Sequence, residues 1–307
     1  MILVAGGTGH LGAHLIPRLL AGGSRVRILT RNSDRARSRL GDELEFVEGD
    51  VRSPESLRMA VAGVESVVSA VTGFGPGGQG PRAVDDEGNG NLIRAAEEAG
   101  VRRFVLLSMR GASAHHPMEL ARMKHRAEQA LRASRLNWTI LRPTPFMDLW
   151  AGIVGDPIKK AGKTTVFGRG DNLINFVAER DVAQIIQLGL VEPRFEHAVL
   201  DVGGPDNLSF NQLVRKLEVA IGRAAAVRHV PLPMMRISAM LTKPFRPDIS
   251  GMIEAGIGFE TSDMGFDPSD VRRLFSPMEL TSVAEVIESR FGVPGPSAVT
   301  APQDATR

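Results

Sequence analysis

Three glycines near the start of the chain have the spacing of a nucleotide-binding turn. Gly6, Gly9 and Gly12 follow the apolar run Ile2 to Ala5 and precede an apolar-periodic segment from Leu11 to Leu20. This order predicts a strand, a sharp turn and a helix whose unpaired N–H groups can bind a pyrophosphate. The alternative is a plain tight turn. The predicted dinucleotide site includes six residues of the turn: Gly6, Thr8, Gly9, His10, Leu11 and Gly12.

The residue that would distinguish NAD from NADP follows the second expected strand, Arg25 to Thr30. In NAD-preferring proteins an Asp or Glu about 20 residues after the glycine turn binds the ribose 2′-hydroxyl. Arg31 takes that place here, and a guanidinium can pair with a phosphate and stack on adenine. We therefore predict NADP(H) as the cofactor, with Arg35 and Arg37 adding positive charge. The alternative is that Arg31 is a solvated loop residue.

Two further strand ends belong to the predicted cofactor site. Asp50 and Val51 follow the third expected strand, where the carboxylate could accept a hydrogen bond from the adenine amino group. Capping of the next helix is the alternative role for Asp50. The stretch Ser69 to Gly73 ends a buried strand in small side chains, which leave space for the ribose and nicotinamide. The predicted site therefore includes Ala70, Val71 and Thr72.

Composition excludes several classes of function. The 307 residues contain no Cys, which excludes disulfides and thiol nucleophiles, and no Tyr. The net charge is +2 and the basic residues are scattered, so we expect no nucleic-acid partner. No His, Asp or Glu cluster has the sequence spacing of a metal site, so no metal is expected. Without a secretory signal or an apolar run near the ~18 residues of a membrane span, we expect a cytoplasmic monomer or homodimer with no membrane partner.

Strand and helix signals alternate through the first half of the chain. This pattern predicts an α/β fold, a Rossmann-type doubly wound parallel sheet with a smaller C-terminal α/β substrate lobe. We expect a dinucleotide-binding core over 1–150, a substrate-binding lobe over 151–293 interleaved with it, and a disordered tail over 294–307. In the lobe, residues 162–172 suggest a loop or hairpin, and residues 232–265 give no clear assignment.

Several segments resemble the NmrA-like NAD(P)H-binding group of the atypical short-chain dehydrogenase/reductases. Beyond the glycine turn and Thr30-Arg31-Asn32, the resemblance is carried by the following motifs: Asp86-Glu87-Gly88-Asn89-Gly90-Asn91-Leu92-Ile93, Ala99-Gly100-Val101-Arg102-Arg103-Phe104-Val105, Thr139-Ile140-Leu141-Arg142-Pro143 with Phe146-Met147, and Asn175-Phe176-Val177 with Arg180-Asp181-Val182-Ala183. Together these segments span about residues 1 to 230. The resemblance implies cofactor binding and leaves the reaction open.

The resemblance also implies a catalytic set. Ser108 lies where the family's catalytic Ser or Thr ends a strand, and Lys124 lies where its Lys binds the nicotinamide ribose. The family's usual proton donor is a Tyr four residues before that Lys, and Leu120 occupies the position here. Proton transfer by Tyr is therefore impossible in this chain. Pro143 and the next residue resemble the loop that contacts the carboxamide.

Two other groups of residues are candidates for substrate chemistry. His116, and beside it His115, lie between Ser108 and Lys124 and could titrate near neutral pH, although solvated loop histidines are the alternative. A Met-rich stretch from Pro231 to Met264 could line an apolar pocket or could form the core of a small lobe. The residues in question are Met234, Met235, Met240, Phe245 and Met252, together with Phe146, Met147 and Trp150.

These features favour an NADPH-dependent reductase of a small hydrophobic carbonyl, enone or quinone. A quinone relaxes the need for a proton donor, because its reduced anion can take a proton from water. The alternative is a non-catalytic NADP(H)-binding sensor, regulator or assembly factor, which the missing Tyr favours. An epimerase or dehydratase of a nucleotide sugar is disfavoured, because those reactions depend on that Tyr.

Overall fold

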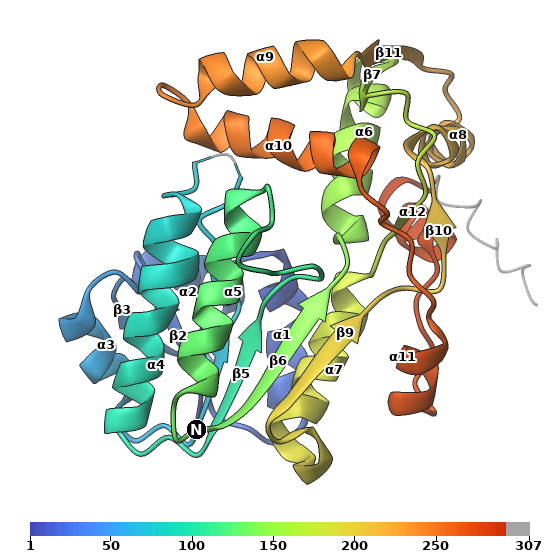
Figure 1. Ribbon diagram of the computed structural model, residues 1–307. Coiled ribbons are helices and arrows are strands. Elements are labelled where there is room, and N and C mark those ends of the chain that lie inside the picture. Colours follow the sequence, from blue (N-terminus) through green and yellow to red (C-terminus); the bar gives the residue numbers. More distant parts are fainter. Residues whose placement is uncertain (76, 293–307) are drawn as a thin grey trace, which may run out of the picture.

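A seven-stranded parallel sheet forms the centre of the protein (Figure 1). The computed structural model describes residues 1–75 and 77–292. All neighbouring strands of the sheet are parallel, which confirms the predicted fold class. The strands lie in the order β3 (Glu45–Glu48), β2 (Val26–Thr30), β1 (Ile2–Ala5), β4 (Ser66–Ser69), β5 (Arg103–Leu107), β6 (Asn137–Pro143) and β9 (Ala198–Val202).

Helices cover both faces of the sheet, and each face has its own apolar core. One core packs β-strand side chains against α3 (Pro54–Val61), α4 (Asn89–Glu98) and α5 (Glu119–Arg132). The other packs them against α1 (His10–Ala21), α7 (Glu179–Val191) and α11 (Ser269–Leu274). A parallel sheet buried on both faces requires apolar residues throughout its strands, and Phe104, Val105 and Leu106 of β5 are fully buried.

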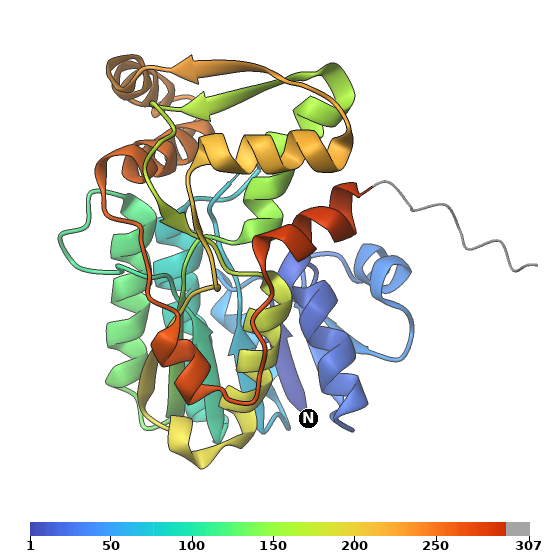
Figure 2. The same cartoon turned by 90° about the vertical axis from the view of Figure 1, so that its right-hand side faces the viewer.

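A third core lies above the sheet and holds the C-terminal part of the chain (Figure 2). Its aromatic rings meet edge to face around Trp150, which contacts Phe167, Phe210 and Phe259. The elements that surround it are α6 (Met147–Ala161), β7 (Lys163–Phe167), β8 (Ile174–Asn175), β10 (Asn207–Leu208), α8 (Phe210–Ile221), β11 (Ala226–Val230), α9 (Leu232–Thr242), α10 (Pro247–Thr261) and α12 (Val283–Phe291). The pairing is parallel for β7 with β11 and antiparallel for β8 with β10.

The chain passes more than once between the central sheet and the part that contains the third core. Helix α6 spans the boundary expected at residue 150, and α7 and β9 then return to the sheet. The expected division into core and lobe therefore stays a prediction, and its tail, 294–307, lies outside the described residues. None of the helices among the described residues is long and apolar enough to cross a membrane.

Several elements differ from the sequence-based expectation. The segment 162–172 contains a strand, β7, whose partner β11 lies about 60 residues away in sequence, so no local hairpin forms. The unassigned segment 232–265 forms a helical hairpin of α9 and α10, at the top of Figure 1. Helix α2 (Ser33–Leu40) and helix α6 were not expected at all. A short π-helix, η1 (Arg82–Gly88), runs directly into α4.

Candidate functional site

The glycine turn connects β1 to α1 in the middle of the sheet. Gly6 has φ +92°, and a Cβ there would lie 2.5 Å from the carbonyl oxygen of Ala70. A Cβ on Gly12 would lie 1.9 Å from the carbonyl oxygen of Gly7, so only glycine lets α1 pack this closely on the turn. Gly9 caps α1 without a side chain, and the first turn of the helix carries no acidic residue. The helix therefore presents N–H groups and a positive dipole end to an anion.

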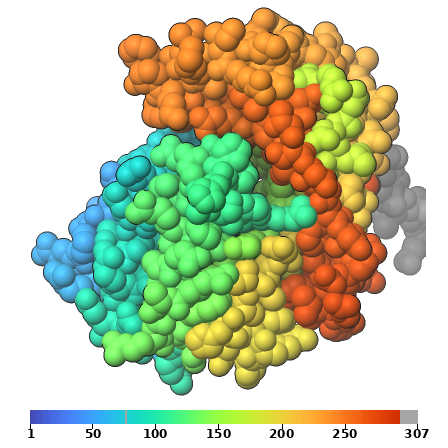
Figure 3. Space-filling model, viewed as in Figure 1, coloured from blue at the N-terminus to red at the C-terminus, as the bar shows by residue number. Residues whose placement is uncertain are grey.

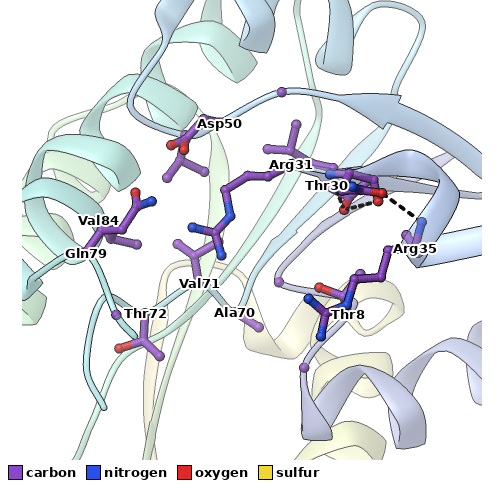
Figure 4. A pocket seen from close by; sticks show the side chains of 18 of the residues that line it. Thr8, Thr30, Arg31, Arg35, Asp50, Ala70, Val71, Thr72, Gln79 and Val84 are labelled. Atoms are coloured by element: carbon purple, nitrogen blue, oxygen red, sulfur yellow. Dashed lines mark hydrogen bonds between the residues drawn. The ribbon is translucent and has the colours of Figure 1, made fainter. Parts of the chain in front are cut away.

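A cavity of about 460 Å³ opens beside this turn (Figure 4). It lies at the carboxyl ends of β1, β2 and β4, where ligands bind in open α/β sheets. The lining includes nine predicted cofactor residues: Gly6, Thr8, Gly9, Arg31, Asp50, Val51, Ala70, Val71 and Thr72. Arg35, expected to add positive charge, also lines the cavity. The rest of the lining was not predicted: Leu29, Thr30, Asn32, Ala36, Arg39, Gly49, Gly77, Gly78, Gln79 and Val84.

Five predicted cofactor residues do not line this cavity: His10, Leu11, Gly12, Lys124 and Pro143. Leu11 is buried in the core beneath α1, and Gly12 is buried against the turn. His10 is exposed at the start of α1. Pro143 is buried in β6, where its carbonyl accepts a hydrogen bond from the backbone N–H of Arg110 at 2.9 Å.

Three arginines give the cavity a strongly positive wall. Figure 4 shows the Arg31 side chain extending into the cavity between Asp50 and Thr8. Asn32 follows directly and caps α2, its Oδ1 accepting from the backbone N–H of Arg35 at 2.8 Å. This cap orients the helix that supplies Arg35 and Arg39 to the same wall.

Two arginines of α2, Arg37 and Arg39, have roles that the sequence did not predict. The Nη1 of Arg39 donates to the carbonyl oxygen of Thr8 at 2.8 Å and so ties α2 to the glycine turn. Arg37 was expected to add charge to the site, but it does not line the cavity. Its guanidinium pairs with Asp42 at 3.3 Å and lies over the ring of Phe46, because α2 turns this side chain to the opposite face.

Asp50 is already bound within the protein. Its two carboxylate oxygens accept from the Nε and Nη2 of Arg52 at 3.0 and 2.8 Å. The side-chain hydrogen bond from Arg52 holds the pKa of Asp50 below its usual range, so the group stays ionised. Ser53, not Asp50, occupies the N-cap position of α3, and the Asp50 carboxylate binds Arg52, so the alternative of helix capping by Asp50 is wrong.

Lys124 lies at the floor of the cavity, behind its lining. Its ammonium, in a residue 5% exposed, donates to the carbonyl oxygens of Val71 at 3.0 Å and Leu107 at 2.9 Å. It also forms an ion pair with Asp85 Oδ1 at 3.0 Å. Asp85 is fully buried in η1, and its other oxygen accepts from the backbone N–H of Gly73 at 2.8 Å. The pair therefore fixes the end of β4 and the following loop.

Ser108 belongs to a different network from Lys124. Its Oγ donates to Glu128 Oε1 at 2.5 Å, and Glu128 is fully buried. Arg142 closes the network with two hydrogen bonds to the same carboxylate, at 2.8 and 2.6 Å. The Ser108 proton is thus held by a charged acceptor inside the fold.

The two histidines between Ser108 and Lys124 lie outside this cavity and outside a second cavity that adjoins it. His116 is half-buried, and its Nδ1 accepts from the backbone N–H of Met118 at 3.1 Å. Burial lowers the pKa of His116, which favours the neutral ring. His115 is exposed.

A second cavity, of about 440 Å³, adjoins the first. The two cavities share Gly78 and Gln79, which lie on the loop between β4 and η1. Leu120, at the position of the family's Tyr, lines this second cavity together with Phe74 and Met118. Helix α10 supplies the opposite wall, and in Figure 3 the orange α9–α10 hairpin overhangs the cyan and green part of the molecule.

The Met-rich stretch lines the second cavity through α10, but the Met and Phe side chains that the sequence suggested for a pocket do not. Met147 and Trp150 are buried in the third core, and Met235, on α9, is buried against α10. Met234 and Met240 are 49% and 68% exposed, and the remaining residues of the set line neither cavity. The surface exposed in the second cavity is mostly apolar, although six charged residues also line it: Arg82, Glu87, Glu119, Lys243, Asp248 and Glu254.

Two functional positions were missed from the sequence. Asp85 stands in a run of acidic residues, which hides the one member that is buried. Arg39 is not among the arginines that the sequence predicts for the site, because its bond to Thr8 depends on how α2 folds back on the turn. A helical assignment for 33–40 would have placed Arg35 and Arg39, four residues apart, on one face.

Comparison with known proteins agrees with this geometry. The chain is 29% identical over 248 residues to the NAD(P)H azoreductase of Xenophilus azovorans, covering 81% of this chain and 82% of that protein. It is 27% identical over 300 residues to the photosystem II assembly factor Ycf39 of Synechocystis sp., covering 95% and 90%. The solved structure of the Escherichia coli NADPH-dependent quinone oxidoreductase QOR2 with NADPH matches with a TM-score of 0.75 at 22% identity, covering 95% of this chain and 100% of that chain.

Family membership follows from a match over most of the core. Residues 6–190 match the model of a family described as NAD(P)H-binding. That range holds the glycine turn, the arginine wall and Lys124, and the fold agrees with the NmrA-like class suggested by the sequence motifs. The chain therefore belongs to this NAD(P)H-binding family.

Proposed function

We propose that the protein is an NADPH-dependent reductase of a small hydrophobic carbonyl, enone or quinone. The observation that carries the proposal is the pair of adjoining cavities that share Gly78 and Gln79. One has the features of a dinucleotide site, and the other offers space for an acceptor beside it. The similarity to an NAD(P)H azoreductase supports the same class of reaction.

The residues present fit a dinucleotide. The close approach at Gly6 and Gly12 leaves the cradle that a Cβ would fill, and the N-terminus of α1 would hold the pyrophosphate. In this proposal Arg31 and Arg35 bind the 2′-phosphate, while Arg39 fixes the turn. When bound, NADPH supplies a hydride to the acceptor.

Proton supply has to differ from that of Tyr-containing relatives. Among the three catalytic candidates, Lys124 is the nearest to the cavity, because its ammonium binds the carbonyl of the lining residue Val71. We assign it the electrostatic role. Ser108 donates to Glu128, and His116 lies outside the cavities, so we give both a lesser part. A quinone acceptor, whose reduced anion takes its proton from water, suits this arrangement best.

The test combines binding and turnover. Calorimetric titration should show tighter binding of NADPH than of NADH, and Arg31→Ala should reduce NADPH affinity about ten-fold or more, since a charge-assisted hydrogen bond contributes about 1.5–3 kcal/mol. Arg37→Ala is the matched control, because Arg37 faces Asp42. NADPH oxidation with a panel of quinones and enones then measures turnover. Equal affinity of the wild type for both cofactors would reject the role of Arg31.

A non-catalytic NADP(H)-binding sensor, regulator or assembly factor is the second candidate. The similarity to Ycf39 covers 95% of this chain, and the Tyr position holds Leu120. Tight NADPH binding with no turnover across the panel would favour this function over the reductase.

A further inference from the structure

Three side chains from distant parts of the sequence meet outside the two cavities. His14 lies on α1, Asp148 lies in the first turn of α6, and Glu179 is the first residue of α7. One ligand atom of each lies within 4.8 Å of the other two. None of the three lines either cavity, so the group is separate from the proposed cofactor and acceptor sites.

The carboxylate of Glu179 is the unusual member of this group. The residue is only 4% exposed, and within 1–75 and 77–292 its carboxylate forms no hydrogen bond or ion pair, while its oxygens keep some contact with solvent. A buried carboxylate without a partner is costly, and a bound cation would supply the missing charge.

The neighbouring charges leave the group open to a cation. Asp148 uses Oδ2 to accept from the backbone N–H of Glu179 at 2.9 Å, which fixes the two carboxylates side by side and leaves Oδ1 available. Arg290, from α12, is the nearby positive charge. Its guanidinium donates to the carbonyl of Asp148 at 3.1 Å and pairs with Asp156 at 3.0 Å, so its charge is already matched.

We propose that His14, Asp148 and Glu179 bind one divalent transition-metal cation of the zinc class. One imidazole and two carboxylates suit Zn²⁺ better than Mg²⁺ or Ca²⁺, which prefer all-oxygen sites. Ligands about 2.0–2.2 Å from zinc lie roughly 3.4 Å apart, so modest side-chain movements would close the group. Water would complete the coordination.

The cation would join three helices that begin far apart in the sequence. It would tie α1, whose N-cap residue Gly9 lines the dinucleotide cavity, to the starts of α6 and α7. Its role would be to stabilise the arrangement of these helices. This inference does not depend on the proposed reductase activity.

The test uses the full-length protein after treatment with EDTA and removal of the chelator. Titration with ZnCl₂ should show one site by calorimetry, and CoCl₂ should produce visible absorption bands of a coordinated cobalt ion. Zinc should also raise the melting temperature. Glu179→Gln and His14→Ala should each weaken zinc binding at least ten-fold and abolish the shift in melting temperature.

The variants keep the test interpretable. Glu179→Gln removes a buried charge without changing shape, and His14 is accessible to solvent, so both variants should fold. His229→Ala, which removes an exposed histidine on β11, is the matched control and should bind zinc as the wild type does. Absence of a single site in the wild type, or unchanged zinc affinity in both cluster variants, would overturn the proposal.

Discussion

At the scale of single residues, the site depends on one buried charge that the sequence does not reveal. Asp85 holds Lys124 by an ion pair and holds the start of the following loop through the N–H of Gly73. Both charged residues are almost completely buried. Removing one member of such a pair leaves the other charge uncompensated inside the protein, so the stability of the fold depends strongly on Asp85.

We therefore predict that Asp85→Asn lowers the free energy of unfolding by about 3–5 kcal/mol, since it leaves the Lys124 ammonium with carbonyl partners alone. Urea denaturation followed by circular dichroism measures the change. The adjacent Asp86→Asn is the control: Asp86 pairs with the largely exposed Arg126, and burial raises the pKa of Asp86, so its loss should cost about 0–1 kcal/mol. Similar losses in the two variants would refute the buried-pair argument.

At the scale of elements, the sequence predicts well those that carry an apolar pattern. The apolar patterns at 198–202 and 283–291 predict a strand and a helix with the bounds that β9 and α12 have. Ser209, directly before an apolar-periodic segment, predicts the start of α8, which it caps in a full capping box. Helix α2 was missed because Ala36 is its single buried residue, so no apolar stripe marks it. Helix α6 was missed because it contains Gly and Pro, yet Gly155 is where the ring of Phe291 packs, 2.6 Å from the position of a Cβ.

The residues of the candidate site also differ in how well the sequence predicts their positions. Residues that follow strands, from the glycine turn to Thr72, line one cavity as the order of elements implied. What the sequence could not give is the direction of side chains on an unexpected helix, such as Arg37 against Arg39. It also could not bring together His14, Asp148 and Glu179, which lie more than 160 residues apart at the extremes.

Helix α2 should be the weak element of the cofactor site, because its cap and not its burial holds it in place. Asn32→Ala should reduce NADPH affinity several-fold by loosening the helix that carries Arg35 and Arg39, with a stability loss of about 1 kcal/mol. Ser282→Ala removes the equivalent cap of α12 and should cost similar stability without changing NADPH affinity. Calorimetry and urea denaturation separate the two effects, and equal NADPH affinity in both variants would contradict this account.

At the scale of the whole molecule, the second cavity exists only because the C-terminal hairpin folds back over the sheet. One wall comes from the loop after β4 and the start of α5, and the other from α10, more than 120 residues later. Ser250 holds the hairpin together through a hydrogen bond from its Oγ to the carbonyl of Ala239 at 3.0 Å. The glycine turn and the arginine wall, in contrast, come entirely from the first half of the chain.

This separation predicts that acceptor use and cofactor binding can be changed independently. Gly251 lies in the α10 wall, and a Cβ there would lie 3.5 Å from the ring of Phe74, so the backbone accepts a larger residue whose side chain takes up cavity space. If the second cavity holds the acceptor, Gly251→Leu should raise the KM for bulky quinones at least several-fold and leave the Kd for NADPH unchanged. Gly258→Leu places the same side chain on the same helix in open space and should alter neither quantity. Unchanged kinetics in Gly251→Leu would move the acceptor site elsewhere, because a leucine in a cavity of about 440 Å³ removes a substantial part of the space an aromatic acceptor needs.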